Sequence, residues 1–242
     1  MLDIHSHILP AVDDGAKDID EAIAILEAMH LQGITSVVTT PHFYPHEDNL
    51  EDYNKKILTA FNDFKKNTVN KTVPEIYLGC EILYYTGISK AQSIRNFTIN
   101  NSNYLLIELN TFSINKMVFE ELLYLRDVRG IIPIIAHIER YRKSRKYKAL
   151  LDFIKQNNIL CQVNATSFFS KDYTKTLKKL FVLDCVSLIA TDSHSMKKRP
   201  PLLKRALEKI AEEYGTEVSE RLIHNADKLY LTIVNKEHGN DF

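Results

Sequence analysis

The chain is poor in glycine, with 7 in 242 residues, and it has no glycine-rich motif of the kind that cradles nucleotides. It also has no Gly-x-Ser-x-Gly sequence, which excludes the nucleophile elbow of serine hydrolases. Lys+Arg and Asp+Glu each number 31, so a net charge of zero predicts no attraction to nucleic acid or to an anionic membrane. The sequence opens without the cationic start and apolar run of a signal peptide, and no stretch approaches the roughly 18 apolar residues of a membrane span. We therefore expect a cytoplasmic protein that is not inserted in the membrane.

Cysteine is also scarce. Cys80, Cys161 and Cys185 are odd in number and widely spaced, so they predict neither a disulfide framework nor a zinc knuckle. Each lies in or just after an apolar run, which favours a buried free thiol. The sixth residues after them are Thr86, Ser167 and Thr191, so the Cys-x5-Arg loop of cysteine phosphatases is absent.

Short β-rich runs alternate with longer amphipathic segments. We expect strands over residues 2–5, 35–40, 75–80, 104–109, 132–137, 159–164 and 186–191. Helical spacing of apolar residues extends over 18–31, 51–66, 115–128, 144–156, 171–182 and 200–214. This alternation predicts parallel βαβ units, and seven units favour an α/β barrel over an open sheet. We expect one domain over residues 1–234 and a polar tail over 235–242.

Histidine and carboxylate side chains stand at the ends of these apolar runs, where turn residues are usual. The candidates are His5, His7, Asp14, His42, Glu81, Glu108, His137, Asp192 and His194. In parallel barrels the reacting groups lie at the C-terminal ends of the strands, so these side chains are expected to converge. Nitrogen and oxygen ligands that converge from several strands predict a multinuclear site for divalent metals.

Two pairs share a spacing that suits ligands. Residues i and i+2 of a strand point to the same side, so His5 and His7 can reach one ion. Asp192 and His194 repeat the spacing at the last strand. Helix capping by Asp192 or Ser193 is an alternative, but it leaves His194 unexplained.

The other candidates differ in how well a structural role explains them. Asp13-Asp14-Gly15 is also typical of a turn, in which one of the two acids serves only the backbone. We favour His42, at a strand end, over His46, which lies in a polar loop. Glu81 and Glu108 end apolar strands, where an unpaired carboxylate is costly and a cation is the simpler partner.

Two arginines follow ligand-bearing strand ends. Arg140 comes three residues after His137, and Arg199 comes five after His194. The planar guanidinium fork suits phosphate. The neighbouring Lys197 and Lys198 are interpreted as a solvated loop.

The motif set resembles the PHP (polymerase and histidinol phosphatase) superfamily. More narrowly, it resembles the bacterial manganese-dependent protein-tyrosine phosphatases linked to capsule and exopolysaccharide regulation. The likeness rests on Asp3-Ile4-His5-Ser6-His7-Ile8-Leu9-Pro10, Val12-Asp13-Asp14-Gly15, Thr40-Pro41-His42, Gly79-Cys80-Glu81, Leu106-Ile107-Glu108, Ala136-His137-Ile138-Glu139-Arg140-Tyr141 and Asp192-Ser193-His194, and it covers nearly the whole chain. Ala11 and Ile138 replace the usual Gly and Pro, and neither position supplies a ligand.

The resemblance implies a distorted seven-stranded barrel with three metal ions. One metal would take His5, His7, Glu81 and Asp192, a second would share Glu81 and take Glu108 and His137, and a third would take Asp14, His42 and His194. Arg140 and Arg199 match the phosphate-binding positions of the family. The resemblance indicates Mn²⁺, and the ligand types also permit Fe or Zn.

The activity it implies is hydrolysis of phosphotyrosine on a protein by a metal-activated water, without a phosphoenzyme. The tail of a membrane-associated tyrosine kinase is one substrate that fits, and regulation of polysaccharide export is the expected role. A small-molecule phosphatase of the histidinol-phosphate type would use the same metals with a different pocket. A nuclease or inactive role, as in PHP domains of polymerases, is disfavoured by the intact ligand set and the neutral charge.

Overall fold

The computed structural model describes residues 1–234, so the expected polar tail over 235–242 lies outside the described residues. The strands are β1 (Leu2–Ser6), β2 (Ser36–Thr39), β3 (His42–Phe43), β4 (Glu75–Leu78), β5 (Glu81–Leu83), β6 (Tyr104–Glu108), β7 (Ile132–Ile135), β8 (Leu160–Asn164) and β9 (Leu188–Ala190). The α-helices are α1 (Ile19–Leu31), α2 (Leu50–Thr68), α3 (Lys116–Asp127), α4 (Tyr147–Asn157), α5 (Thr174–Val182), α6 (Leu203–Tyr214) and α7 (Thr216–Val234). Five 3-10 helices complete the described elements: η1 (Ile88–Lys90), η2 (Gln92–Phe97), η3 (Ile99–Asn101), η4 (Ile138–Lys143) and η5 (Ala165–Phe169).

All seven expected strands are present, and two of them are interrupted. The second continues as β3 beyond Thr40-Pro41, and the third continues as β5 beyond Gly79-Cys80. Proline cannot donate a hydrogen bond to a neighbouring strand, which accounts for the first break. At the second break, a Cβ added to Gly79 would lie 3.0 Å from Val38 Cγ1, so the two strands approach each other closely there.

The strands form a closed, parallel arrangement. They pair in the orders β1-β2-β4 and β3-β5-β6-β7-β8-β9, and every pair is parallel. The first and last strands meet where His7 N donates to Ser193 O at 2.8 Å and Asp192 N donates to His5 O at 2.9 Å. The expected distorted α/β barrel is therefore confirmed.

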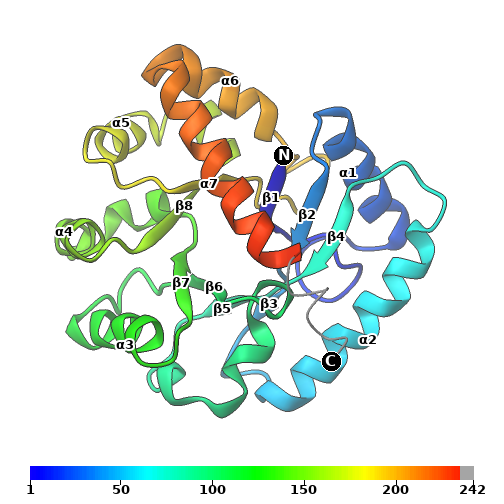
Figure 1. Ribbon diagram of the computed structural model, residues 1–242, viewed down its shortest axis with the longest axis horizontal. Helices are drawn as coiled ribbons and strands as arrows, with labels where there is room; N and C mark the ends of the chain where they lie inside the picture. The colour runs from blue at the N-terminus through cyan, green and yellow to red at the C-terminus, as the bar shows by residue number, and fades with distance from the viewer. Residues whose placement is uncertain (235–242) are drawn as a thin grey trace.

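Two apolar layers hold the barrel together. One lies between the strands and the surrounding helices α1 to α6 (Figure 1), and its buried residues include Ile25, Phe64 and Leu122. The other fills the barrel interior with side chains such as Ile4, Leu106 and Ile134. Burial of both faces explains why these strands are apolar almost throughout.

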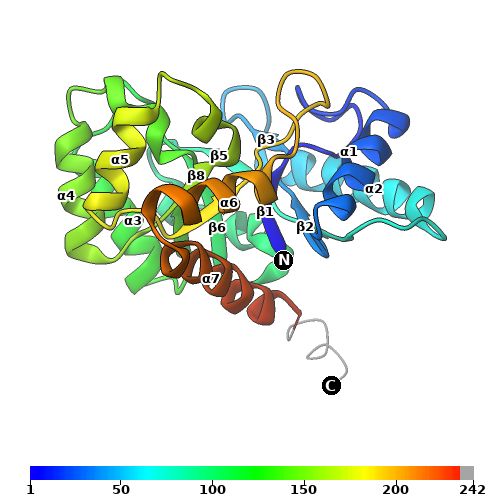
Figure 2. The same ribbon diagram turned by 90° about the horizontal axis from the view of Figure 1, so that it is seen from above.

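Helix α7 covers one end of the barrel interior. Its residues Ala226, Leu229 and Ile233 pack against the interior cluster, at the spacing of one helical face. Figure 2 shows α7 on one side of the barrel and the loops that follow the strands on the other. The C-terminal ends of the strands therefore lie at the end of the barrel opposite α7.

The expected helices are confirmed, with boundaries that shift by a few residues. The helix expected over 171–182 begins at Thr174, and the helix expected over 200–214 begins at Leu203. Helix α7 was not predicted as a separate element, and η1 to η3 connect β5 to β6 without an α-helix. Across residues 1–234, none of the helices combines the length and the apolar character that crossing a membrane requires.

Candidate metal centre

Nine side chains gather at the C-terminal ends of the strands, as the sequence predicts. Three sets have ligand atoms that all lie within 4.8 Å of one another. The sets are His7, Asp14, His42 and His194; His5, His7 and Glu81; and His42, Glu81 and Glu108. The two remaining candidates are His137, whose Nε2 lies 2.9 Å from Glu81, and Asp192, whose Oδ1 lies 3.5 Å from both His5 and His7.

Glu81 lies at the centre of the cluster. Its Oε2 is 3.1 Å from His5 Nε2 and 3.2 Å from His7 Nε2, and the carboxylate is 1% exposed. Burial alone would raise the pKa of Glu81, but His5 and the other imidazoles hold it well below its usual value. A buried, ionised carboxylate that faces several imidazoles is suited to bridging two cations.

Asp192 joins the cluster to the two arginines. Its Oδ2 accepts hydrogen bonds from Arg140 and, at 2.6 Å, from Asn164 Nδ2, while Arg199 Nη1 lies 3.3 Å from Oδ1. Burial opposes ionisation, but His5 and Arg140 hold the pKa of Asp192 below its usual value. The capping alternative is wrong, because the next helix begins at Leu203 and Asp192 points into the cluster.

The two acids after β1 have different contacts. Asp14 Oδ1 lies 3.2 Å from His194 Nε2 and 3.6 Å from His42 Nε2, and Arg199 donates to its Oδ2 at 3.0 Å. Asp13 instead accepts from His7 Nδ1 at 2.6 Å and from the backbone of Gly15 and His42 at 3.0 Å. Asp14 is therefore the acid placed to hold a metal, and Asp13 positions the histidines and the turn.

Glu108 forms the outer edge of the cluster. It is 24% exposed, and its Oε1 lies 3.5 Å from His137 Nε2. Burial, together with the charge of Glu81, raises the pKa of Glu108 to about 7. Two carboxylates in one site repel each other, and a cation between them relieves that repulsion.

The donor atoms fit divalent metal ions. The Nε2 atoms of His5 and His7 face each other at 3.1 Å, and both lie close to Glu81 Oε2. His42 Nδ1 and His194 Nε2 are buried without a hydrogen-bond partner, although carboxylate oxygens lie 3.1 and 3.2 Å away. Converging nitrogen and oxygen donors, some of them buried without a hydrogen-bond partner, are the arrangement that a cation completes.

Two amides on β8 support the cluster, and the motif argument missed them. Gln162 Oε1 lies 3.2 Å from His5 Nδ1 and accepts from His137 N at 2.9 Å. Gln162 Nε2 donates to Asn164 Oδ1 at 2.7 Å, which links the histidines to the contact between Asn164 and Asp192. Partners of this kind fix the ring orientation of metal ligands. Two amides at spacing i, i+2 in a buried apolar strand were the signal available in the sequence.

Two cluster residues adopt backbone conformations that are uncommon for residues other than glycine. His137 has φ 32° and Asp192 has φ 49°, both in the left-handed region. Each begins the turn after its strand, so the backbone bends as the side chain enters the cluster. Such conformations cost free energy and concentrate at functional sites.

His46 and the three cysteines were not expected to serve the site, and they lie outside it. His46 is 67% exposed and pairs with Glu47 in the loop before α2. Cys80, Cys161 and Cys185 are buried free thiols, and burial raises the pKa of each. Thiols without access to solvent cannot attack a phosphate group on another protein.

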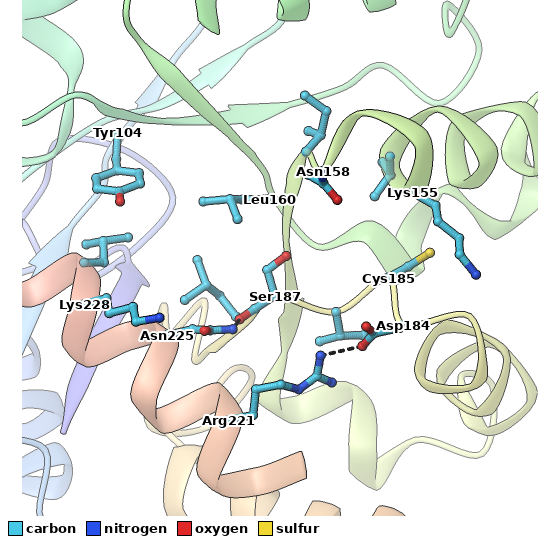
Figure 3. Close-up of a pocket in the computed structure, with 15 residues that line it drawn as sticks. Tyr104, Lys155, Asn158, Leu160, Asp184, Cys185, Ser187, Arg221, Asn225 and Lys228 are labelled. Atoms are coloured by element: carbon cyan, nitrogen blue, oxygen red, sulfur yellow. Dashed lines mark hydrogen bonds and ion pairs between the residues drawn. The ribbon is translucent and has the colours of Figure 1, made fainter. Parts of the chain in front are cut away.

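A separate cavity of about 480 Å³ opens at the other end of the barrel, between α4, the loop before β9 and α7 (Figure 3). Tyr104 and Leu160, at the starts of their strands, line it together with Lys155 and Lys228. Arg221 pairs with Asp184 at its edge. None of the nine clustered residues lines this cavity, so it is distinct from the metal centre.

Comparison with known proteins identifies the family. The family model described as "Capsular polysaccharide synthesis, CpsB/CapC" matches residues 1–231. The chain belongs to the CpsB/CapC family. Among CpsB/CapC relatives, tyrosine-protein phosphatase YwqE of Bacillus subtilis is 30% identical over 95% of this chain and 91% of its own. Tyrosine-protein phosphatase CpsB of Streptococcus pneumoniae is 32% identical, and the alignment covers 96% of this chain and 98% of CpsB.

A solved structure extends the likeness to three dimensions. It belongs to crystallographic work on YwqE from Bacillus subtilis and CpsB from Streptococcus pneumoniae, described as unique metal-dependent tyrosine phosphatases. Its sequence is 28% identical to this chain, and the two structures superpose with a TM-score of 0.85. The match covers 97% of this chain and 95% of the other chain. The CpsB/CapC fold is therefore shared over almost the whole length.

Proposed function

We propose that this chain is a metal-dependent protein-tyrosine phosphatase that acts in capsular polysaccharide synthesis. The observation that carries the proposal is the cluster around Glu81, in which histidine and carboxylate atoms converge from several strand ends beside two arginines. Membership of the CpsB/CapC family supports the same conclusion. The catalytic unit would be a single PHP domain over residues 1–234.

We assign nine residues to the metals, and their short mutual distances support the set as a whole. The first metal would lie among His5, His7, Glu81 and Asp192, the second among Glu81, Glu108 and His137, and the third among Asp14, His42 and His194. His7 lies close to the third group as well as the first, and His42 lies close to Glu81 and Glu108. The mixed nitrogen and oxygen donors suit Mn²⁺ and also permit Fe or Zn.

Bound divalent metals would supply Lewis-acid neutralisation of the phosphate oxygens and a water of lowered pKa. The chain's own contribution is to place the donors and to bind the substrate. Arg140 and Arg199 are part-exposed and contact Asp192, which supports the proposal that both guanidinium groups would bind a phosphate held at the metals. Preorganised donors of this kind stabilise charge that develops in the transition state.

A cysteine-based mechanism does not fit this chain. Within the described residues all three thiols are buried, and none belongs to the metal cluster. The phosphate would therefore pass to water without a covalent intermediate on a thiol. A Cys80→Ser, Cys161→Ser, Cys185→Ser variant that stays folded should retain activity.

We further propose that the substrate is a phosphotyrosyl segment of a bacterial tyrosine kinase, such as its tail. We also propose that the phosphatase acts in the cytoplasm. The exposed edge of the site, where Asp14 is 61% and Glu108 is 24% exposed, supports access by a residue presented on another protein.

The decisive experiment offers three substrates to the purified protein with Mn²⁺: a phosphotyrosyl peptide, a phosphoseryl peptide and histidinol phosphate. We expect the phosphotyrosyl peptide to be preferred, chelation to abolish turnover and Mn²⁺ to restore it. Preference for histidinol phosphate would indicate a small-molecule phosphatase instead. Activity that survives complete removal of metal would contradict the proposed chemistry.

A further inference from the structure

Charge is unevenly distributed around the open end of the barrel, although the chain is neutral as a whole. Loops that follow the strands form this mouth, on the side opposite α7 (Figure 2). The loops after β7, β8 and β9 are basic, whereas the loops after β1 and β3 are acidic. The metal centre lies between the two halves.

The basic half carries exposed cations on three loops. These exposed cations are Lys143, Arg145, Lys146, Lys171, Lys197 and Lys198. We call this set of residues the basic rim. None of them takes part in the ion pairs found among residues 1–234. Asp172 is the one exposed acid in residues 138–148, 169–175 and 195–200. Exposed like charges without partners create a positive potential that an anionic ligand would neutralise.

Aromatic contacts join these loops into one surface. The guanidinium of Arg142 lies 4.2 Å from the ring centroid of Tyr173, which connects the loop after β7 to the loop after β8. Arg205 and Lys209 of α6 lie 4.9 and 5.5 Å from the ring centroid of Phe169, which connects the loop after β8 to the helix that follows β9. Cation–π contacts hold cations beside aromatic faces without neutralising them. These contacts tie the loop after β7 to the loop after β8, and the loop after β8 to α6.

The opposite half of the mouth has the reverse composition. Its exposed acids are Asp14, Asp18, Asp20, Glu47, Glu51 and Asp52, in residues 11–21 and 44–52. Lys17 is the one lysine or arginine in those segments, and it lies 3.7 Å from Asp18. This half would repel an acidic ligand, whereas the basic half would attract it. The ligand would therefore bind across the mouth in one orientation, with its acidic residues over the basic half.

The basic rim adjoins the two arginines of the site. Lys143 lies three residues after Arg140, and Lys198 directly precedes Arg199. Both arginines contact Asp192 inside the cluster. A chain whose phosphate reached these arginines would carry its flanking residues over the basic rim.

We infer that the basic rim binds acidic residues that flank the phosphotyrosine of a protein substrate. The inference rests on the proposed phosphatase function and names its substrate class: an acidic phosphotyrosyl segment. Charge complementarity is the recognition element, and it acts mainly on encounter and on KM. The apolar interior of the barrel and the metals take no part in it.

The test compares two phosphotyrosyl peptides of equal length with Mn²⁺ present. One carries Glu and Asp on both sides of the phosphotyrosine, and the other carries Gln and Asn at those positions. We expect kcat/KM to be about tenfold higher for the acidic peptide at low salt, within the range of electrostatic steering. The ratio should approach one at about 1 M salt, because the Debye length falls to about 3 Å.

A matched pair of variants locates the effect. The rim variant carries Lys143→Gln, Lys197→Gln and Lys198→Gln. It should lower the kcat/KM ratio between the two peptides at least about threefold, since it removes three cations from the basic rim. The control, Lys71→Gln, Lys155→Gln, Lys228→Gln, removes the same charge from exposed residues outside the loops of the mouth, two of which line the separate cavity. It should keep the wild-type ratio.

Two kinds of failure are distinguishable. If the wild-type protein hydrolyses both peptides and p-nitrophenyl phosphate but the peptide ratio is near one, the basic rim has no role in recognition. The same conclusion follows if rim and control variants keep equal ratios. If none of the three substrates is hydrolysed by the Mn²⁺-loaded protein, the proposed function itself fails.

Discussion

Asp13 accepts a hydrogen bond from His7 Nδ1 at 2.6 Å, and this contact turns His7 Nε2 toward Glu81. The same carboxylate accepts from the backbone N–H of His42 at 3.0 Å, so it fixes two candidate ligands at once. Burial disfavours the ionised form, yet the His7 contact holds the pKa of Asp13 below its usual value. Asp13 is thus a positioning residue beside the metal centre.

Asp13→Asn should weaken metal binding about ten- to hundredfold, the scale for losing a partner of a ligating histidine. The amide keeps one acceptor oxygen but loses the charge that holds the His7 N–H. Calorimetric titration with Mn²⁺ measures the change. Asp20→Asn, at an exposed position in the first turn of α1, removes the same charge and should bind as wild type does. Equal affinity in the two variants would contradict this role.

Asp192→Asn should lose metal and most turnover while remaining folded. An amide cannot supply the negative charge that now faces His5, His7 and the arginines. We expect kcat/KM to fall by about 10²-fold or more, on the scale of a lost electrostatic contact in an active site. Metal analysis of the purified variant, beside its activity, checks the prediction. Asp184→Asn, which breaks an exposed pair with Arg221, is the control, and full metal occupancy in Asp192→Asn would remove Asp192 from the ligand set.

Arg199→Ala should reduce kcat/KM by about 2–4 kcal/mol of transition-state stabilisation. Its side chain is 30% exposed and contacts Asp14 and Asp192, so it reaches the edge of the cluster without being one of the proposed ligands. Bound metal should therefore stay near the wild-type amount. Steady-state kinetics and metal analysis together test this, with Arg221→Ala as the matched control. Kinetics equal to the control would exclude Arg199 from phosphate binding.

Metal binding should release protons at neutral pH. Burial lowers the pKa of His7, but Asp13 and Glu81 outweigh it and raise the pKa to about 10 in the metal-free protein. Metals bind neutral imidazole, so the proton on His7 must leave. The apparent affinity should then rise as pH increases toward about 10, where proton competition ends. Calorimetry in two buffers of different ionisation enthalpy measures the release, and identical apparent enthalpies would contradict it.

The end of the barrel under α7 should be important for stability. Leu229 is 2% exposed and packs in the interior cluster. Leu229→Ala should cost about 2–5 kcal/mol of unfolding free energy through lost burial and the cavity it leaves. Urea unfolding measures the loss, and Leu231→Ala, at a residue 59% exposed on the same helix, should change stability little. Equal stabilities would show that α7 does not seal the interior.

The sequence predicts the strands and the convergence of the clustered side chains well because both rest on local patterns. Buried parallel strands are apolar throughout, and polar residues at their ends stand out against that background. The break at Pro41 follows from the proline itself, whereas the break at Gly79 depends on how neighbouring strands meet, which no single segment encodes. The different roles of Asp13 and Asp14 could not be predicted either, because adjacent residues of one turn differ only in the direction of their side chains. Helix α7 was missed because the predicted helices ended at residue 214, and no separate element was assigned after Gly215.

Closure of the barrel by α7 has a consequence for how the protein is made. The first strand emerges from the ribosome early, but one of its partners, β9, and the helix that covers both come from residues 188–234. Until those residues are synthesised, Leu2 and Ile4 cannot be fully buried in the interior cluster, and the sheet of the nascent chain remains incomplete. Folding of this barrel is therefore expected to finish after synthesis of α7, and apolar strand edges that stay exposed during that interval would favour aggregation of the nascent chain.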